Sequence, residues 1–347
     1  MRLDDLKIGI NFPAFVAAEI SGNHGGSLSY ALDLIGLASA SGAQGVKFQT
    51  YTADTLSIDS NKQYFQLPSN SPWKDSENHY QLYKKAHTPW EWLPKLFEHS
   101  RKLNIIPFSS PFDESAVEFL EQLDCPMYKV ASPEINHVPL LRRLAKTNKP
   151  IILSLGVASE SDVSLAVEEI RKISKSEIVI LQCETKYPAE PYRANLKLLW
   201  RLEKDYDCVV GISDHTIGSE LVDVAIGAGS KFFEKHIKLA GKSTVDDFFS
   251  ADPDEFKKYV WRIRNAESML GEAIFRHQKD DEFRRSNSRS IFACQDINKG
   301  HIFTESNVKI VRPGYGLEPI RLYDLIGKFA NRDIERGEPI TEFDFHE

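Results

Sequence analysis

Short apolar runs alternate with amphipathic stretches along most of the chain. The runs have the length of buried strands, and they predict strands at 15–20, 45–49, 105–109, 127–131, 151–154, 178–182, 209–213 and 231–234. Helical patterns lie between most of them, at 29–40, 114–123, 139–147, 160–174 and 219–227. This alternation predicts an α/β protein with a parallel sheet, and eight strands predict a closed (β/α)8 TIM barrel.

Most of the predicted strands end in polar or charged residues. In a barrel the carboxyl ends of all strands converge on one mouth, where barrel enzymes hold their active sites. A doubly wound open sheet would bring only some of these ends to a crevice. We therefore favour the barrel and expect a site among Glu19, Lys47, Gln49, Ser109, Ser110, Lys129, Ser132, Ser154, Ser213 and Glu234.

The pattern changes after residue 275. Residues 276–287 are strongly charged and predict a linker between a barrel domain at 1–275 and a small domain at 288–347. The last segment has short apolar runs separated by turns, and Asn298-Lys299-Gly300 resembles Glu335-Arg336-Gly337 as a turn before an apolar segment. We expect a compact domain of short strands, near the ~60 residues that still fold alone.

Composition narrows the class of protein. Hydrophobic residues make up 41% and charged residues 27%, as in ordinary globular proteins. A net charge of -7 argues against a nucleic-acid partner but not against a small anion, which needs only a local cluster of cations. Four cysteines, widely spaced, indicate no disulfide framework or zinc site. We expect no secretion signal, no membrane span and a cytoplasmic location.

Two histidines follow the last two predicted strands, in Gly211-Ile-Ser-Asp-His215-Thr and Phe232-Phe-Glu-Lys-His236. Two imidazoles meeting at a barrel mouth suit a divalent transition metal, with further positions left for water or substrate. Hydrogen-bonded loop histidines with no ligand would give the same spacing.

A cationic group accompanies them. Lys47 and Lys129 end two strands, and Ser132, Ser154 and Ser213 end others, so ammonium and hydroxyl groups together can hold a phosphate and a carboxylate. The alternative interpretation is that the same lysines form ion pairs with Glu19, Glu134 or Glu234.

The segment from Ala18 to Gly26 contains Glu19, Asn23 and His24 before two glycines. The glycines permit a tight loop, but their spacing matches neither a dinucleotide fingerprint nor a P-loop. The polar cluster is suited to sugar hydroxyls, while a plain start of a helix capped by Ser27 fits equally well.

Several motifs in a fixed order resemble the sialic acid synthase family over essentially the whole chain. They are Ala-Glu-Ile-Ser-Gly-Asn-His-Gly-Gly (18–26), Lys-Phe-Gln-Thr-Tyr-Thr (47–52), Phe-Ser-Ser-Pro-Phe (108–112), Tyr-Lys-Val-Ala-Ser-Pro-Glu (128–134), Gly-Ile-Ser-Asp-His-Thr (211–216) and Glu-Lys-His (234–236). Arg-Ser-Ile-Phe-Ala (289–293) and Val-Arg-Pro-Gly-Tyr-Gly-Leu (311–317) resemble the family's antifreeze-like, or SAF, domain.

The resemblance implies a barrel followed by an SAF domain, in a domain-swapped homodimer that condenses phosphoenolpyruvate with an N-acylated amino sugar. It implies that His215 and His236 bind Mn²⁺ or Mg²⁺. For the reaction we expect Glu19, Glu134, Glu234 or a metal-bound water to handle the protons, and the sequence does not choose among them. The resemblance assigns phosphoenolpyruvate to Lys47, Ser109, Ser110, Lys129, Ser132, Ser154 and Ser213. The sugar would meet Asn23, Gln49, Tyr187, either Asp246 or Asp247, and Arg312 of the other subunit.

Within the family, residues 47–52 and the aromatic-rich segment 72–92 are most similar to the pseudaminic acid synthase branch. The acceptor there would be 2,4-diacetamido-2,4,6-trideoxy-altrose. Pro133, Glu184 and Lys186 depart from the usual pattern and leave open N-acetylmannosamine or the mannose-type diacetamido isomer, the acceptors for N-acetylneuraminate and legionaminic acid. Outside the family, the alternatives are a metal-dependent hydrolase or aldolase and a non-catalytic carbohydrate-binding protein. The insert at 64–92 is either a lid or structural packing.

Overall fold

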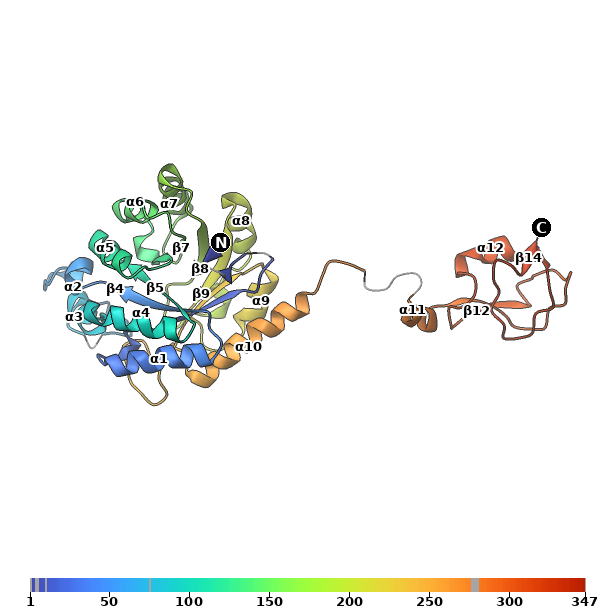
Figure 1. Ribbon diagram of the computed structural model, residues 1–347, viewed down its shortest axis with the longest axis horizontal. Helices are drawn as coiled ribbons and strands as arrows, with labels where there is room; N and C mark the ends of the chain where they lie inside the picture. Colours follow the sequence, from blue (N-terminus) through green and yellow to red (C-terminus); the bar gives the residue numbers. More distant parts are fainter. Residues whose placement is uncertain (1, 4–5, 10, 75, 276–280, 347) are drawn as a thin grey trace. The chain divides into compact units, whose positions relative to one another are not determined.

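A computed structural model describes residues 2–3, 6–9, 11–74, 76–275 and 281–346 (Figure 1). The chain divides into two compact units, Met1–Gly271 and Glu272–Glu347, each with a hydrophobic core of its own. No helix within the described ranges is long and apolar enough to cross a membrane.

The first unit is a closed barrel of parallel strands, which confirms the predicted fold (Figure 1). Around the barrel the order is β10-β3-β4-β5-β6-β7-β8-β9, so each strand lies beside its neighbour in sequence and the last closes on the first. The strands are β3 (Phe15–Glu19), β4 (Gly45–Thr50), β5 (Ile106–Pro111), β6 (Tyr128–Val130), β7 (Ile151–Ser154), β8 (Ile178–Cys183), β9 (Val209–Asp214) and β10 (Phe232–His236).

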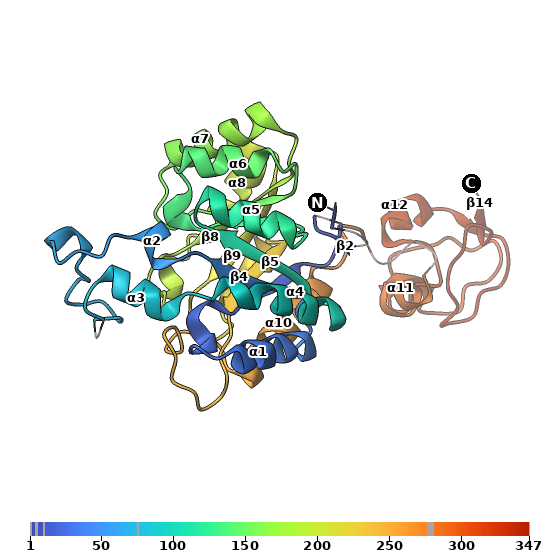
Figure 2. The same ribbon diagram turned by 60° about the vertical axis from the view of Figure 1, so that its left-hand side comes forward.

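Helices surround the strands in both views (Figures 1 and 2). The surrounding helices are α1 (Leu28–Ala40), α4 (Leu93–Lys102), α5 (Glu114–Gln122), α6 (Val138–Ala145), α7 (Glu160–Ile173), α8 (Leu198–Tyr206), α9 (Leu221–Gly227) and α10 (Pro253–Leu270). Shorter elements are β1 (Arg2–Leu3), β2 (Leu6–Lys7), η1 (Ser21–His24), α2 (Ala53–Leu56), η2 (Gln63–Phe65), α3 (His79–Ala86), η3 (Trp90–Trp92), η4 (Ser132–Glu134) and η5 (Pro191–Arg193). The apolar pattern had not singled out α4, α8 or α10.

Aromatic packing fills one part of the barrel interior. The Phe15 ring centroid lies 4.9 Å from that of Phe232 and 6.5 Å from that of Phe108, and all three side chains are buried. Gly211 on β9 permits the close approach of β10, since a Cβ at this position would lie 2.3 Å from the Phe232 carbonyl oxygen. The glycine of the Gly-Ile-Ser-Asp-His motif is therefore required by packing.

Several strands extend beyond their predicted ends, into the polar residues. β4 runs to Thr50, β8 to Cys183 and β9 to Asp214, while β10 includes His236, which the pattern had placed after the strand. Polar residues usually mark the end of a buried strand, but here the barrel mouth buries them and supplies their partners.

The second unit contains short strands around a small apolar core, as its pattern predicts. Its elements are α11 (Glu282–Asn287), β11 (Ser290–Ala293), β12 (Val308–Val311), η6 (Pro319–Arg321), α12 (Leu322–Leu325), β13 (Phe329–Ala330) and β14 (Phe345–His346). The two resembling turns have the same backbone form, with φ of +82° at Gly300 and +93° at Gly337.

The second half of the predicted linker at 276–287 is helical in the structure. Residues 282–287 form α11, which begins after Asp281, whose carboxylate accepts from the Phe283 amide. The charged composition of this segment had concealed a capped helix. Residues 276–280 of the predicted linker lie outside the described residues.

Candidate active site

The strand register brings the predicted charged residues together at the carboxyl ends of adjacent strands. Glu19 at the end of β3 pairs with Lys47 of β4 on one side and with His236 of β10 on the other. Glu234 of β10 pairs with Ser213 of β9. Residues far apart in the sequence thus occupy one end of the barrel, as the barrel prediction requires.

Two lysines and two glutamates form a buried cluster there. The Lys47 ammonium lies 2.9 Å from Glu19 Oε2 and 3.5 Å from Glu234 Oε1. Lys129 Nζ lies 3.2 Å from the same Glu234 oxygen, which also accepts a hydrogen bond of 3.0 Å from Ser213. The ion pairs that we weighed against a ligand site are therefore present, with Glu19 and Glu234 as the partners.

The two carboxyl groups titrate very differently. Burial raises the pKa of Glu19 to about 7, although Lys47 opposes this, and the neighbouring Glu234 adds to the rise. Burial would also raise the pKa of Glu234, but Lys129 and Lys47 outweigh it and hold that pKa at about 2. Near neutral pH Glu234 is therefore a carboxylate and Glu19 exchanges a proton. Burial lowers the pKa of Lys129, whereas Glu19 and Glu234 outweigh burial and raise the pKa of Lys47.

Hydroxyl groups line the same end of the barrel. Ser110 accepts a hydrogen bond of 3.2 Å from Lys47, and Ser132 accepts one of 2.6 Å from the Val157 amide. Ser109 precedes Ser110 on β5 and so lies on the opposite face of the strand, where it is bonded to Thr50 at 2.7 Å; the structure does not bring this predicted candidate to Lys47. The buried Ser154 hydroxyl has no partner among the described residues, so it is available to an oxygen-rich ligand.

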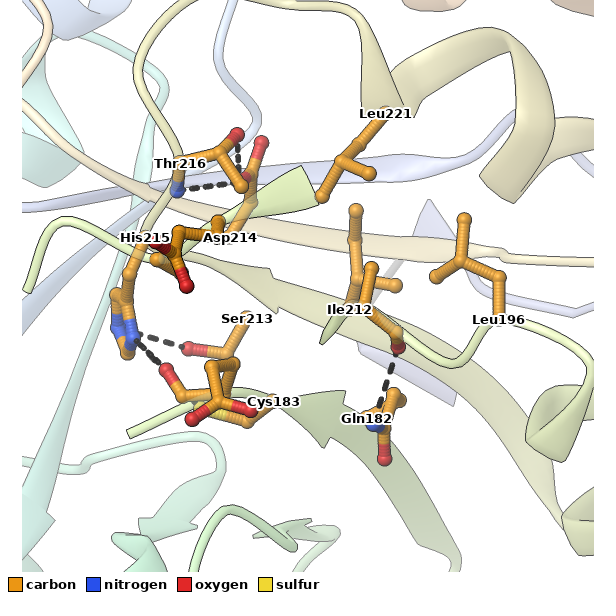
Figure 3. A pocket seen from close by; sticks show the side chains of 13 residues that line it. Gln182, Cys183, Leu196, Ile212, Ser213, Asp214, His215, Thr216 and Leu221 are labelled. Carbon is orange, nitrogen blue, oxygen red and sulfur yellow. Dashed lines mark hydrogen bonds between the residues drawn. The ribbon is translucent and has the colours of Figure 1, made fainter. Parts of the chain in front are cut away.

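The two histidine rings lie next to each other beside this cluster, edge to face, with ring centroids 5.3 Å apart and planes at 67°. His215 lies directly after β9, and its Nδ1 is 3.0 Å from the Glu184 carbonyl oxygen, an acceptor that fixes the proton on Nδ1. Its Nε2 lies 3.4 Å from the Ser213 hydroxyl (Figure 3). Burial lowers the pKa of His215 to about 4 and that of His236 well below its usual value, so both rings are neutral near pH 7.

Two neutral imidazoles with free nitrogens suit a divalent transition metal. His215 donates from Nδ1, which leaves Nε2 as a lone-pair nitrogen, and His236 Nδ1 is buried without a partner in the described part of the chain. Residues within that part form no group of three or more His, Cys, Asp or Glu placed to hold an ion. The side chains therefore fit a site in which two histidines bind the metal and water or substrate completes it.

An aromatic wall, formed by Trp73, Tyr187, Phe248 and Phe249, adjoins the histidines. The Tyr187 ring lies 4.5 Å from His215 and 4.8 Å from Phe249, and Phe249 lies 4.7 Å from His236. Trp73 extends the wall, with its ring 5.5 Å from Tyr187 and its Nε1 donating to the Val245 carbonyl at 2.9 Å. Sequence reasoning had named Tyr187 as a site residue and had noted Trp73 only as part of the aromatic-rich segment 72–92. It missed Phe248 and Phe249, because nothing in their local pattern distinguishes them from core aromatics.

The remaining sugar candidates differ in how they are used. Asp246 is buried and accepts from Ser21, and burial raises its pKa, whereas Asp247 is partly exposed and its backbone carbonyl accepts from Lys238 at 2.8 Å. Asn23 donates to the Ile237 carbonyl at 2.9 Å, which fixes it to the end of β10.

Three further candidates for binding the sugar or handling protons are Gln49, Glu134 and Arg312. Gln49 is half-buried at the end of β4. Glu134 in η4 has its pKa raised to about 7 by burial, and its Oε2 lacks a partner among the residues described. Arg312 is exposed in the second unit.

A closed parallel barrel with buried lysines, hydroxyls and neighbouring imidazoles at one end is typical of a (β/α)8 enzyme. Residues 34–275 match the NeuB family and residues 288–345 match the SAF domain. The chain belongs to the NeuB family and is an acid synthase of that class, as the sequence motifs had indicated.

Named relatives agree with this membership. A pseudaminic acid synthase of Campylobacter jejuni is 39% identical over 332 residues, covering 95% of this chain and 96% of the relative. An N,N'-diacetyllegionaminic acid synthase of the same species is 33% identical, covering 94% of this chain and 98% of the relative. Among solved structures, an N-acetylneuraminic acid synthetase from Leptospira borgpetersenii, in complex with citrate, matches with a TM-score of 0.73 and 31% identity over 83% of this chain and 96% of that one.

Proposed function

We propose that the enzyme condenses phosphoenolpyruvate with the open-chain aldehyde of a 2,4-diacetamido-2,4,6-trideoxyhexose of the altrose type, giving pseudaminic acid and phosphate. The observation that carries the proposal is that Lys47 and Lys129 are buried around Glu234, at the end of the barrel where β7 ends in the unpartnered Ser154 hydroxyl and where the two histidines lie. Ammonium groups and hydroxyls in this arrangement suit a substrate that carries both a phosphate and a carboxylate.

The charge of the cluster favours such a ligand. With Glu19 protonated, Lys47 and Lys129 face only the Glu234 carboxylate, so one positive charge is uncompensated. Burial at the barrel mouth strengthens the attraction of this charge for an anion, since water screens it little. Ser110, Ser132, Ser154 and Ser213 add hydroxyls that orient the phosphate and carboxylate oxygens.

The reaction joins C3 of phosphoenolpyruvate to the aldehyde carbon of the sugar. The enol electrons form the new C–C bond, the aldehyde oxygen takes up a proton, and water adds to the cationic C2 and loses its own proton. Cleavage of the bond between C2 and the bridging oxygen then releases phosphate. We assign the proton on the aldehyde oxygen to Glu19, because its pKa of about 7 lets it donate near neutral pH, which Glu234 cannot do.

His215 and His236 would hold Mn²⁺ or Mg²⁺. When bound, the metal supplies a Lewis acid that polarises the aldehyde. The chain's own contribution is to keep both imidazoles neutral and buried, and to hold the two substrates in register at the barrel mouth.

The aromatic wall supports the choice of acceptor. A 6-deoxy sugar with acetamido groups has more apolar surface than N-acetylmannosamine, and Trp73, Tyr187 and Phe249 offer an apolar face next to the histidines. The 39% identity to pseudaminic acid synthases supports the same acceptor. Glu134, Gln49 and Asp246 would bond the sugar's polar groups, with Asn23 fixing the surrounding loop.

We also propose a domain-swapped homodimer, in which Arg312 of one subunit meets the sugar's acyl group bound by the other. Its side chain is exposed in the second unit, as this contact requires. Mixing inactive Arg312→Ala and His236→Ala proteins under conditions that exchange subunits should restore activity, because some sites then receive both intact residues. Mixtures that stay inactive despite exchange would refute the swapped contact.

Four free thiols are consistent with a cytoplasmic, reducing location.

The reaction itself is tested with phosphoenolpyruvate labelled with ¹⁸O in the bridging position. Metal-loaded enzyme with the altrose-type acceptor should release phosphate that retains the label, because the C–O bond breaks. Unlabelled phosphate would contradict the chemistry. Phosphate released equally without any acceptor would instead support a hydrolase.

A further inference from the structure

The residue before each site histidine is charged and buried on the opposite face of its strand. Asp214 precedes His215 and Lys235 precedes His236, and both charged side chains are buried. Successive residues of a strand point to opposite faces, so when the histidines face the barrel mouth these two face the surrounding helices. Tyr259 of α10 meets them there, with its ring centroid 4.9 Å from Lys235 Nζ.

The two charged residues contact each other and the turn that carries His215. Lys235 Nζ donates to Asp214 Oδ2 at 3.2 Å and to the Thr216 carbonyl at 2.7 Å. The other oxygen of Asp214 accepts from the Thr216 amide at 2.9 Å and from its hydroxyl at 2.7 Å (Figure 3). The residue before His215 is therefore a member of the ion pair, and the residue after His215 is hydrogen-bonded to both of its members.

The ion pair also joins the two strands at the level of the histidines. Lys235 of β10 and Asp214, the last residue of β9, are register partners, and each comes one residue before its histidine. A shift of either strand, or a rotation of the 214–216 turn, would break several hydrogen bonds in a buried environment, where unpaired polar groups are costly. The pair therefore fixes the relative positions of two imidazoles whose centroids are 5.3 Å apart.

A buried ion pair is a weak source of stability compared with apolar packing, so a geometric role explains it better. We propose that Asp214 and Lys235 are positioning residues that set the spacing of His215 and His236 for one divalent cation. The inference rests on the proposed metal role of the histidines. Partners outside the first ligand shell commonly change metal affinity 10–100-fold when they are removed.

The experiment measures the Kd for Mn²⁺ in metal-stripped, full-length protein, with free Mn²⁺ followed by electron paramagnetic resonance. Lys235→Met keeps the aliphatic stem but removes the charge, and should weaken Mn²⁺ binding by about tenfold or more. Because this change strands a buried carboxylate, the double variant Asp214→Asn/Lys235→Met provides a second test without an unpaired charge. It should bind Mn²⁺ as weakly as the single variant while unfolding at higher urea.

Leu144→Ala is the control for lost stability, since Leu144 is a fully buried side chain on α6 and far in sequence from the site. It should lower stability and leave the Kd for Mn²⁺ unchanged. A wild-type Kd for Mn²⁺ in both charge variants overturns the positioning role. An equal weakening of Mn²⁺ binding in Leu144→Ala overturns it too.

His236→Ala separates this inference from the metal proposal on which it rests. If His236→Ala binds Mn²⁺ as wild type does, the metal site itself is wrong. If His236→Ala loses binding while both charge variants keep it, the positioning inference alone is wrong.

Discussion

Replacing each buried glutamate of the cluster by glutamine should change stability in opposite directions at pH 6. The pKa of Glu234 falls from 4.5 to about 2 on folding, so its stabilisation is present above pH 4.5 and is lost as pH falls toward 2. A shift of this size is worth about 3 kcal/mol at about 1.4 kcal/mol per unit. Glu234→Gln removes this contribution and leaves Lys129 and Lys47 short of a partner.

Glu19 has the opposite linkage. Its pKa rises from 4.5 to about 7, so its contribution is greatest below pH 4.5 and declines as pH rises through about 7. At pH 6 the unfolded carboxyl is ionised and the folded one is mostly protonated, which favours unfolding by about 2 kcal/mol relative to a group that does not titrate. Glu19→Gln should therefore be more stable than wild type, by up to about 2 kcal/mol.

Urea unfolding followed by tryptophan fluorescence measures both effects, because all five tryptophans lie in the barrel unit. Midpoints should move in opposite directions, with Glu234→Gln down by roughly 1 M. At pH 3 the loss of stability in Glu234→Gln should be smaller, because unfolded wild-type protein then has this carboxyl largely protonated and the ionised Glu234 stabilises the fold less. Equal losses in the two variants at pH 6 would refute the assignment of one permanent and one exchanging carboxyl.

Three other outcomes follow from the same contacts. The Kd for phosphoenolpyruvate, measured without acceptor, should rise as pH increases through about 7, because ionised Glu19 cancels the spare positive charge. In Glu19→Gln this rise should vanish, and its persistence would remove Glu19 from the explanation. Trp73→Ala should raise the KM for the acceptor about tenfold and leave the KM for phosphoenolpyruvate nearly unchanged. Replacing the exposed Trp261 by alanine should change neither KM. An equal rise of both KM values in Trp73→Ala would show that Trp73 does not contact the acceptor. Gly211→Ala should cost roughly 2 kcal/mol or more in urea unfolding, since its Cβ would meet the Phe232 carbonyl, and an unchanged midpoint would show that β10 can move.

The barrel was predictable because its strands are nearly continuous apolar runs at regular spacing. Such runs are required of parallel strands buried on both faces, and β7 at Ile151–Ser154 was placed without error. The ends of β4, β8 and β10 were less predictable, because their polar residues find partners across the mouth rather than along the chain. Helix α11 was hidden by its charge and is identified only by its cap.

The convergence of the charged and histidine candidates was also predictable, since strand ends meet in any closed parallel barrel. The sequence did not show which lysine pairs with which glutamate, or that the pKa of Glu19 is raised while that of Glu234 is lowered. Those properties depend on burial and on distances across strands. The places of Trp73 and Phe249 in the site were unpredictable for the same reason, because only the folded chain brings their rings against Tyr187 and His236.

The most direct test of the proposed function compares three acceptors in one assay. Phosphate release from phosphoenolpyruvate is followed with Mn²⁺ present and with the altrose derivative, its mannose-type diacetamido isomer or N-acetylmannosamine added separately, and each product is identified by mass. We expect kcat/KM to be highest by far for the altrose derivative, with one phosphate released per pseudaminic acid formed. Preference for either other acceptor would reassign the branch, and no acceptor-dependent release by folded, metal-loaded enzyme would contradict the synthase itself.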